Sequence, residues 1–408
     1  MKSRMMIMMA AGAIMAFRGV LAADIPANSS RLTYAENPDG TLMVTGVEPG
    51  GIVDGKLIVP ESHDGTNVTT LNTGVFANNE EIKSVHLPST LCEISMAAFV
   101  ACVNLTSVYI ADGVTNLNDG AFYMCSSLEH IRLPQSLQVI GSDAFSGCAA
   151  LAEVEFPDGL KRIEFEAFSP SGIKEVILPD SVEYLGVNAF RNCGSLTNAV
   201  LASNLKVVPE AAFQLCKNLK SVLLPAHVEI IGGSAFASTE IETVVIPASC
   251  TNMGHSVFSN VKAAYFDGDA PKTSMPGMLS LPPIPVGATL YLKYNASGFD
   301  EFPWVDKDGH SNYNIIREKE PEEGNLLITA FAVEGEKMNF TVRLVDEQGG
   351  QNIPDAGRKV RLLGAGLLTE EFEECSEPIA LDANGSFEAN LPEGKTTFFF
   401  KVRLEPAE

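Results

Sequence analysis

The chain has 408 residues, of which 51 are Asp or Glu and 28 are Lys or Arg, so its net charge is −23. A surface this acidic repels phosphate backbones and anionic lipid head groups, which excludes nucleic acid as a partner. With 46% hydrophobic and 19% charged residues, the composition is that of a globular protein large enough for two or three domains.

Residues 1–22 have the pattern of a secretory signal peptide. Lys2 and Arg4 precede an apolar run from Met5 to Phe17, and small residues follow around Ala22. The run is shorter than the roughly 20 residues that span a bilayer. We expect export, to the outside or the cell surface, of a mature chain that does not insert into a membrane. The alternatives are a periplasmic location and an uncleaved, tethered form.

Residues 23–75 are expected to form an N-terminal cap. The segments 32–34 and 41–45 flank the turn residues Asn37, Pro38, Asp39 and Gly40, which is typical of a β-hairpin. The stretch from Leu57 to Pro60 then resembles a degenerate first coil of the repeats that follow.

Residues 76–267 carry an internal repeat marked by phenylalanine. One unit alternates as Leu-x-x-Ile-x-Leu-Pro, which is typical of a strand ended by proline, and a second extended piece leads to the next turn. A single unit cannot bury its apolar edge, so about nine coils of about 22–23 residues should stack into a mainly β, parallel-sheet solenoid. Nine phenylalanines at spacings of 22 or 23 residues would form its spine: Phe76, Phe99, Phe122, Phe145, Phe168, Phe190, Phe213, Phe236 and Phe258.

The repeating unit, Leu-x-x-Val-x-Leu-Pro-x-x-Val-x-x-Ile-Gly-x-x-Ala-Phe-x-x-Cys, resembles the BspA-type leucine-rich repeat of bacterial and some protist surface proteins. The resemblance covers about residues 31 to 267. The units at Phe168 and Phe236 depart from it by one missing residue, and the pattern runs down after Phe258. The resemblance implies an exposed binding scaffold, an adhesin in its best-known members, and it identifies no ligand.

The repeat pattern stops after Asp267. Residues 268–318, with a strand-like stretch at 288–294 and the single tryptophan Trp304, are expected to cap the end of the solenoid. A charged linker, 319–324, precedes a C-terminal module, 325–408. Five strand-like stretches predict a small Ig-like β-sandwich there: 326–333, 338–345, 359–363, 386–391 and 397–404.

The candidate binding residues occupy the strand position whose side chains should point away from the core. The first four are polar or amphipathic: His86, Tyr109, Arg132 and Glu155. The next five are apolar or aromatic: Ile177, Val200, Leu223, Val245 and Tyr265. Stacking would align these five as a stripe about 20 Å long, and an exposed apolar patch usually marks a contact surface. The alternatives are that β-branched residues merely suit strands, or that the capping segment covers them.

Five cysteines occupy one column, three residues after a spine phenylalanine: Cys102, Cys125, Cys148, Cys193 and Cys216. Neighbouring coils would lie within disulfide range, and export would permit oxidation. Asn79, Ser171 and Thr239 fill the same position elsewhere, which favours reduced thiols packed in a tight turn. Without a Cys-x-x-Cys pair or a histidine partner, the column predicts no metal site.

The sequence shows no catalytic constellation, because no histidine lies in a His-Glu-x-x-His or beside a Gly-x-Ser-x-Gly motif. The segment 393–396 ends like a phosphate loop, but Ala389 replaces the required glycine. The segments 306–312 and 267–269 resemble calcium turns without the full ligand spacing. We therefore predict that the chain is not an enzyme and holds no cofactor or metal. We also expect it to be a monomer.

Two functions remain. The first is adhesion or binding, in which the repeat sheet holds a protein or glycan of a host or bacterial surface. The second is a structural spacer in the cell envelope or an extracellular layer.

Overall fold

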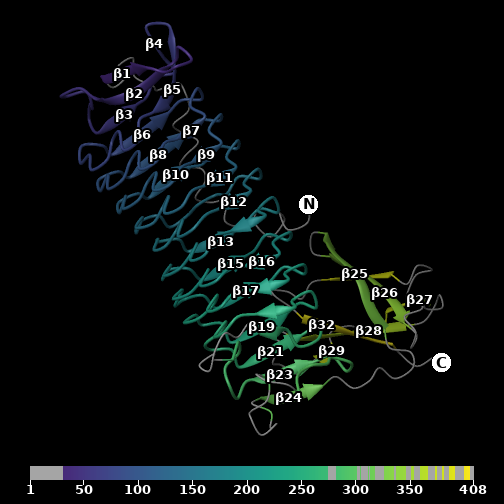
Figure 1. Cartoon of the computed structure of the whole chain (residues 1–408). Coiled ribbons are helices and arrows are strands. Elements are labelled where there is room, and N and C mark those ends of the chain that lie inside the picture. The colour runs from purple at the N-terminus through teal and green to yellow at the C-terminus, as the bar shows by residue number, and fades with distance from the viewer. Residues whose placement is uncertain are drawn as a thin grey trace. The chain divides into compact units, whose positions relative to one another are not determined.

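The computed structural model describes residues 31–273, 282–300, 304, 311 and 313–317, together with the strands between 326 and 404. The chain divides into two compact units, of which one is Pro26–Glu318 and the other contains Lys319–Glu408. Every regular element in the described part is a β-strand. The first unit is a stack of coils that runs from β1 to β24 (Figure 1), which confirms the predicted solenoid.

The first coils are covered by a small sheet in the order β1-β2-β5-β4. Its strands are β1 (Leu32–Glu36), β2 (Leu42–Val47), β4 (Ser62–His63) and β5 (Thr66–Leu71). The first two strands pair as an antiparallel hairpin, as predicted, and the N–H of Asn37 closes the turn on the carbonyl of Thr41 at 2.8 Å. Val44 and Val68 are fully buried, so this sheet contributes to the solenoid core.

One side of the solenoid, the long-strand face, is built from the Leu-x-x-Ile-x-Leu part of each unit. Its strands form three parallel ladders, in the orders β10-β8-β6-β3, β13-β15-β17 and β19-β21-β23-β24. They are β3 (Lys56–Ile58), β6 (Ser84–Leu87), β8 (Ser107–Ile110), β10 (His130–Arg132), β13 (Glu175–Ile177), β15 (Asn198–Val200), β17 (Ser221–Leu223), β19 (Thr243–Ile246), β21 (Ala263–Phe266), β23 (Thr289–Leu292) and β24 (Asn314–Arg317).

A second side, the short-strand face, is built from the piece that precedes each turn. Its two-residue strands also form parallel ladders, in the orders β14-β12-β11-β9-β7 and β16-β18-β20-β22. They are β7 (Glu93–Ile94), β9 (Asn116–Leu117), β11 (Val139–Ile140), β12 (Arg162–Ile163), β14 (Tyr184–Leu185), β16 (Val207–Val208), β18 (Ile230–Ile231), β20 (Asn252–Met253) and β22 (Lys272–Thr273).

The predicted phenylalanine spine is present. Consecutive rings stack with centroids 5.1 to 5.6 Å apart from Phe76 to Phe258, and all nine side chains are buried. Most rings sit in a turn flanked on both sides by residues with positive φ; around Phe99 these are Ala97 at 55° and Ala101 at 53°. Because the N–H of Phe99 also donates to Ala121 O at 2.9 Å in the next coil, the turns are bonded to one another as the strands are.

The long-strand face is interrupted at residues 151–157, where the sequence predicted a strand through Glu155. These residues form no strand, and β10 and β13 share no ladder. Phe156 occupies the place that Leu133 holds one coil earlier, and its ring packs edge-on against Phe168 at 5.7 Å. In the following turn Pro170 stands where other turns have positive φ, which proline cannot adopt. The predicted strand at Glu155 was therefore wrong, because the larger ring and the altered turn take this coil out of the ladder.

The sheets continue past Asp267, where the sequence predicted that the repeat pattern stops. The phenylalanine spacing ends at Phe258, but β22, β23 and β24 extend both faces. Aromatic residues of a different arrangement fill the core there. Trp304 packs edge-on against Phe266 at 5.5 Å and also contacts Phe299 and Tyr313.

The C-terminal unit holds two antiparallel sheets of four strands each. Their strands are β25 (Leu326–Glu334), β26 (Lys337–Val345), β27 (Gln351–Asn352), β28 (Lys359–Ala365), β29 (Glu373–Glu374), β30 (Ile379–Ala380), β31 (Ser386–Asn390) and β32 (Phe399–Leu404). The five stretches predicted from the sequence are all strands. The Ig-like arrangement itself stays a prediction.

Candidate functional site

Side chains on the long-strand face alternate between core and solvent, as the pleat of a strand requires. In β19, Val244 and Ile246 are buried, whereas Val245 between them is 41% exposed. One outward side chain per coil therefore lies near the middle of each long strand. These are the positions that the sequence selected as candidate binding residues.

The five predicted apolar residues form one outward column with a single step in it. Ile177, Val200 and Leu223 lie opposite one another on β13, β15 and β17. Val245 and Tyr265 are likewise in register on β19 and β21. Leu223 is 68% exposed, and Ile177, Val200 and Tyr265 are half-buried. The step lies between β17 and β19, which are neighbours without a shared ladder.

Two residues that the sequence analysis missed extend this column. Tyr291 lies opposite Tyr265, and Ile316 lies opposite Tyr291. The alternation of Leu290, Tyr291 and Leu292 was a usable signal, but no spine phenylalanine marked these coils. We call the seven residues the outer stripe: Ile177, Val200, Leu223, Val245, Tyr265, Tyr291 and Ile316. The described part of the predicted capping segment thus lengthens the column.

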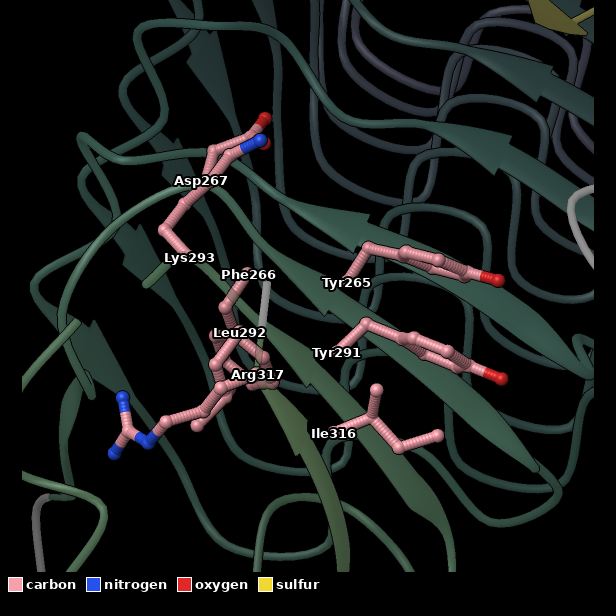
Figure 2. Close-up of a pocket in the computed structure, with 8 residues that line it drawn as sticks. All are labelled: Tyr265, Phe266, Asp267, Tyr291, Leu292, Lys293, Ile316 and Arg317. Atoms are coloured by element: carbon pink, nitrogen blue, oxygen red, sulfur yellow. The ribbon is translucent and has the colours of Figure 1, made fainter. Parts of the chain in front are cut away.

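A hollow of about 170 Å³ lies at the C-terminal end of the outer stripe. Figure 2 shows the parallel rings of Tyr265 and Tyr291 on one side of it and Asp267 with Lys293 on the other. The ring centroids are 4.4 Å apart, and burial together with Tyr291 raises the pKa of Tyr265 to about 12. Since each ring covers one face of the other, this pair presents its ring edges to a ligand.

The polar candidates His86, Tyr109 and Arg132 lie together in the N-terminal half of the long-strand face. The ring of Tyr109 stacks on the imidazole of His86, with ring centroids 4.6 Å apart. The guanidinium carbon of Arg132 lies 4.9 Å from the centre of the Tyr109 ring. Burial lowers the pKa of His86 below its usual value, against a smaller opposing effect of Glu61. Glu155 does not join this stack, because its coil has no strand.

A second group of exposed apolar side chains, which the sequence analysis also missed, lies on the short-strand face. Tyr184 is 40% exposed, Val207 42% and Ile230 39%. Val207 and Ile230 are in register, and the guanidinium of Arg162 covers the ring of Tyr184 at 4.1 Å. Here too the signal was alternation, in the second extended piece of each unit.

The sequence matches the family described as BspA type leucine rich repeat region, in 6 copies, over residues 61–171 and 138–264. These ranges together span half of the chain. The chain belongs to the BspA-type leucine-rich repeat family. A comparison with curated proteins found no match.

Several solved structures are similar to this BspA-type protein. A leucine-rich repeat protein from Bacteroides ovatus is 22% identical, with a TM-score of 0.48 over 70% of this chain and 75% of its own. A leucine rich repeat protein from T. pallidum is 29% identical, with a TM-score of 0.39 over 51% of this chain and 86% of its own. A leucine rich cell surface protein from Faecalibacterium prausnitzii is 20% identical, with a TM-score of 0.30 over 59% of this chain and 94% of its own.

The cysteine column of the BspA-type repeats lies in the core. All five cysteines are buried and free. Each thiol donates to the carbonyl of a phenylalanine in an earlier turn, as Cys125 does to Phe99 O at 3.0 Å and Cys148 to Phe122 O at 3.2 Å. Burial raises the pKa of Cys148 to about 12. A small side chain with a hydrogen-bond donor therefore suits this position, which explains why serine and threonine share it.

The turn motifs singled out in the sequence have structural explanations or lie outside the described residues. Asp269 accepts hydrogen bonds from the backbone N–H and the hydroxyl of Ser297, at 2.8 and 2.9 Å, so it joins two loops that are 28 residues apart in the chain. The predicted turns at 306–312, apart from Ser311, and at 393–396 lie outside the described residues. Within the described part, no group of three or more His, Cys, Asp or Glu is placed to hold a metal ion. No described helix is long and apolar enough to cross a membrane.

Proposed function

We propose that this BspA-type chain is an exported, non-enzymatic binding scaffold that recognises a protein or glycan of a host or bacterial surface. The observation that carries the proposal is the outer stripe, an outward column of seven apolar or aromatic side chains on the long-strand face. Soluble proteins rarely leave such a contiguous column facing water unless it meets a partner. Leu223, at 68% exposed, is its most accessible member.

The architecture supports this role because it holds the stripe in a fixed geometry. The in-register ladders, the stacked spine and the hydrogen-bonded turns connect each coil to its neighbours. A preorganised surface loses less conformational entropy when it binds than a mobile loop does. Each stripe residue is therefore presented at a spacing of about one coil, near 4.8 Å, without a cost of ordering.

Polar groups beside the stripe would add specificity. Asn198 donates to a carboxylate oxygen of Glu175 at 2.9 Å, one column across from Ile177 and Val200. Farther along the same face, the stack of His86, Tyr109 and Arg132 offers a cation and ring edges. An apolar centre with polar groups around it is the usual composition of a protein-binding surface.

Export and a monomeric state belong to the same proposal. The signal-like segment 1–22 supports transfer out of the cytoplasm. The net charge of −23 supports a chain that repels its own copies. The alternative is a structural spacer, which the continuous stacking of the coils would also suit, but a spacer has no need of the outer stripe.

The test is a pair of matched double variants in the same two coils. Val200→Asp with Leu223→Asp changes the outer stripe, and Val207→Asp with Ile230→Asp makes the same chemical change on the short-strand face. Each substitution should lower stability by about 1 kcal/mol or less, because the side chains face solvent. Circular dichroism and thermal melting measure this directly.

Labelled protein is then applied to intact epithelial cells and intact bacteria, before and after protease or glycosidase treatment. We expect the stripe variant to lose about tenfold or more in affinity and the short-strand variant to bind like the wild type. Which treatment removes binding distinguishes a protein from a glycan partner. Loss only in the short-strand variant would move the interface to that face, and failure of the wild type to bind any of these surfaces would favour the spacer.

A further inference from the structure

The last strand of the long-strand face has an open edge. Among the described strands, β24 pairs with β23 alone. All four of its residues are exposed, with Ile315 at 36% and Ile316 at 49%.

The register identifies the backbone groups that face outward. The N–H of Asn314 donates to Ala288 O at 3.0 Å, and Leu290 lies opposite Ile315. In a parallel ladder alternate residues bond to the same neighbour. Asn314 and Ile316 therefore bond to β23, whereas the N–H and C=O of Ile315 and the N–H of Arg317 point to the other side.

Two features that protect a sheet edge against further pairing, a proline and a bulge, are absent from β24. Natural sheets protect an edge with proline, a bulge or an inward charge. The pairing of β24 is regular along its length, the strand contains no proline, and the side chain of Arg317 is engaged with Ala296 O at 2.6 Å. We propose that the open edge of β24 binds an extended segment of a partner polypeptide, which adds a strand to the long-strand face.

An added strand would gain more than backbone hydrogen bonds. Ile316 is the last member of the outer stripe, so an apolar residue of the new strand would lie beside it and lengthen the stripe by one coil. Alternate side chains of an added strand give such complexes their specificity. The inference goes beyond the proposed function, because it concerns the edge of the sheet and not its outer face.

The charge of the chain identifies the chemistry of the occupant. Two copies, each with a net charge of −23, repel each other at the distances at which they would first meet, whereas a basic segment is attracted. The occupant is therefore an extended segment that contains lysine or arginine and is carried by another protein. Because it pairs as a strand, it also contains β-branched residues.

The test uses the full chain and a fluorescein-labelled peptide, Lys-Thr-Val-Thr-Val-Lys. A second peptide with proline in place of both valines serves as a control, because it cannot pair along its length. The variant Ile315→Pro removes an outward N–H while leaving the N–H groups of Asn314 and Ile316 for β23. The matched variant Ile315→Val keeps the N–H and the branched side chain.

We expect the fluorescence anisotropy of the peptide to saturate with the wild type and with Ile315→Val, and the binding to weaken at higher salt. Ile315→Pro should lose about tenfold or more in affinity at an unchanged melting temperature. Equal binding by Ile315→Pro, or no saturation by the wild type up to about 1 mM peptide, would overturn the inference. A doubling of mass in light scattering that Ile315→Pro abolishes would assign the edge to a second copy instead. The variant Val200→Asp with Leu223→Asp should bind the peptide normally, which separates this result from the proposed function.

Discussion

Truncation of one spine residue tests how the solenoid is held together. Phe145 is fully buried and stacks on Phe122 at 5.6 Å and on Phe168 at 5.1 Å. Phe258, at the end of the spine, is also buried, and among the described rings it stacks on Phe236 alone, at 5.3 Å. The same change to alanine therefore removes two ring contacts at the first position and one at the second.

The expected cost follows from burial and from the number of contacts. A buried phenylalanine replaced by alanine lowers the free energy of unfolding by about 3 to 5 kcal/mol, and each aromatic pair contributes about 0.5 to 1.5 kcal/mol beyond burial. We therefore expect Phe145→Ala to cost about 5 kcal/mol and Phe258→Ala about 0.5 to 1.5 kcal/mol less.

Urea titration of the full chain, followed by circular dichroism, measures both losses. Hydrogen exchange should show that Phe145→Ala exposes amides in the two adjoining coils first, because each coil contacts mainly its neighbours. Equal losses at the two positions would refute the nearest-neighbour reasoning. So would a Phe145→Ala chain whose exchange rises uniformly along the array.

Two further predictions concern titratable side chains of the array. Alkylation at pH 8 followed by mass spectrometry should leave the five column cysteines unlabelled in the native chain and label them in denaturant, because all five side chains are buried from the reagent. For Cys148 burial also raises the pKa to about 12. Intact-mass evidence for two bonds within the column would contradict this. Since burial lowers the pKa of His86, the unfolded chain takes up a proton before the folded chain as pH falls below about 6.5. The wild type should therefore lose more stability than His86→Gln between pH 7.5 and pH 5 in parallel melts, and an equal loss would contradict the assignment.

The repeat period predicted the core of the fold because the core is periodic. The nine phenylalanines stack as expected, and the Leu-x-x-Ile-x-Leu alternation gave the long strands. The turns were harder to predict. Residues such as Ala97, Met124 and Leu215 adopt positive φ there, although side chains of this kind disfavour that region. The ladders on both sides of each turn hold these residues in place, and no local sequence pattern shows that constraint.

The two errors in the fold arose where a side chain broke the period. Phe156 has the apolar character that the pattern requires, but its volume differs from that of leucine, and hydrophobic patterning alone does not register volume. Beyond Asp267 the reverse occurred, since the marker phenylalanine disappeared while the strands continued. Alternation identified the candidate column, and its role in binding stays a proposal. Tyr291 and Ile316 were missed because outward positions were identified from the phenylalanine spacing, which ends at Phe258.

The way the spine ends explains why β24 has an open edge. A stack of parallel rings always leaves the face of its last ring to be covered, so it cannot end by adding another phenylalanine. In this chain Phe258 is the last described ring of that stack. Beyond it, Trp304 and Phe299 pack at steep angles on Phe266 of β21, which is not a spine residue, and such edge-to-face contacts leave no parallel stack to be extended. The hydrogen-bond ladder has no equivalent way to close, because each added strand exposes a new set of N–H and C=O groups. The core can therefore be complete at Trp304 while the long-strand face is still able to accept one more strand beside Ile315.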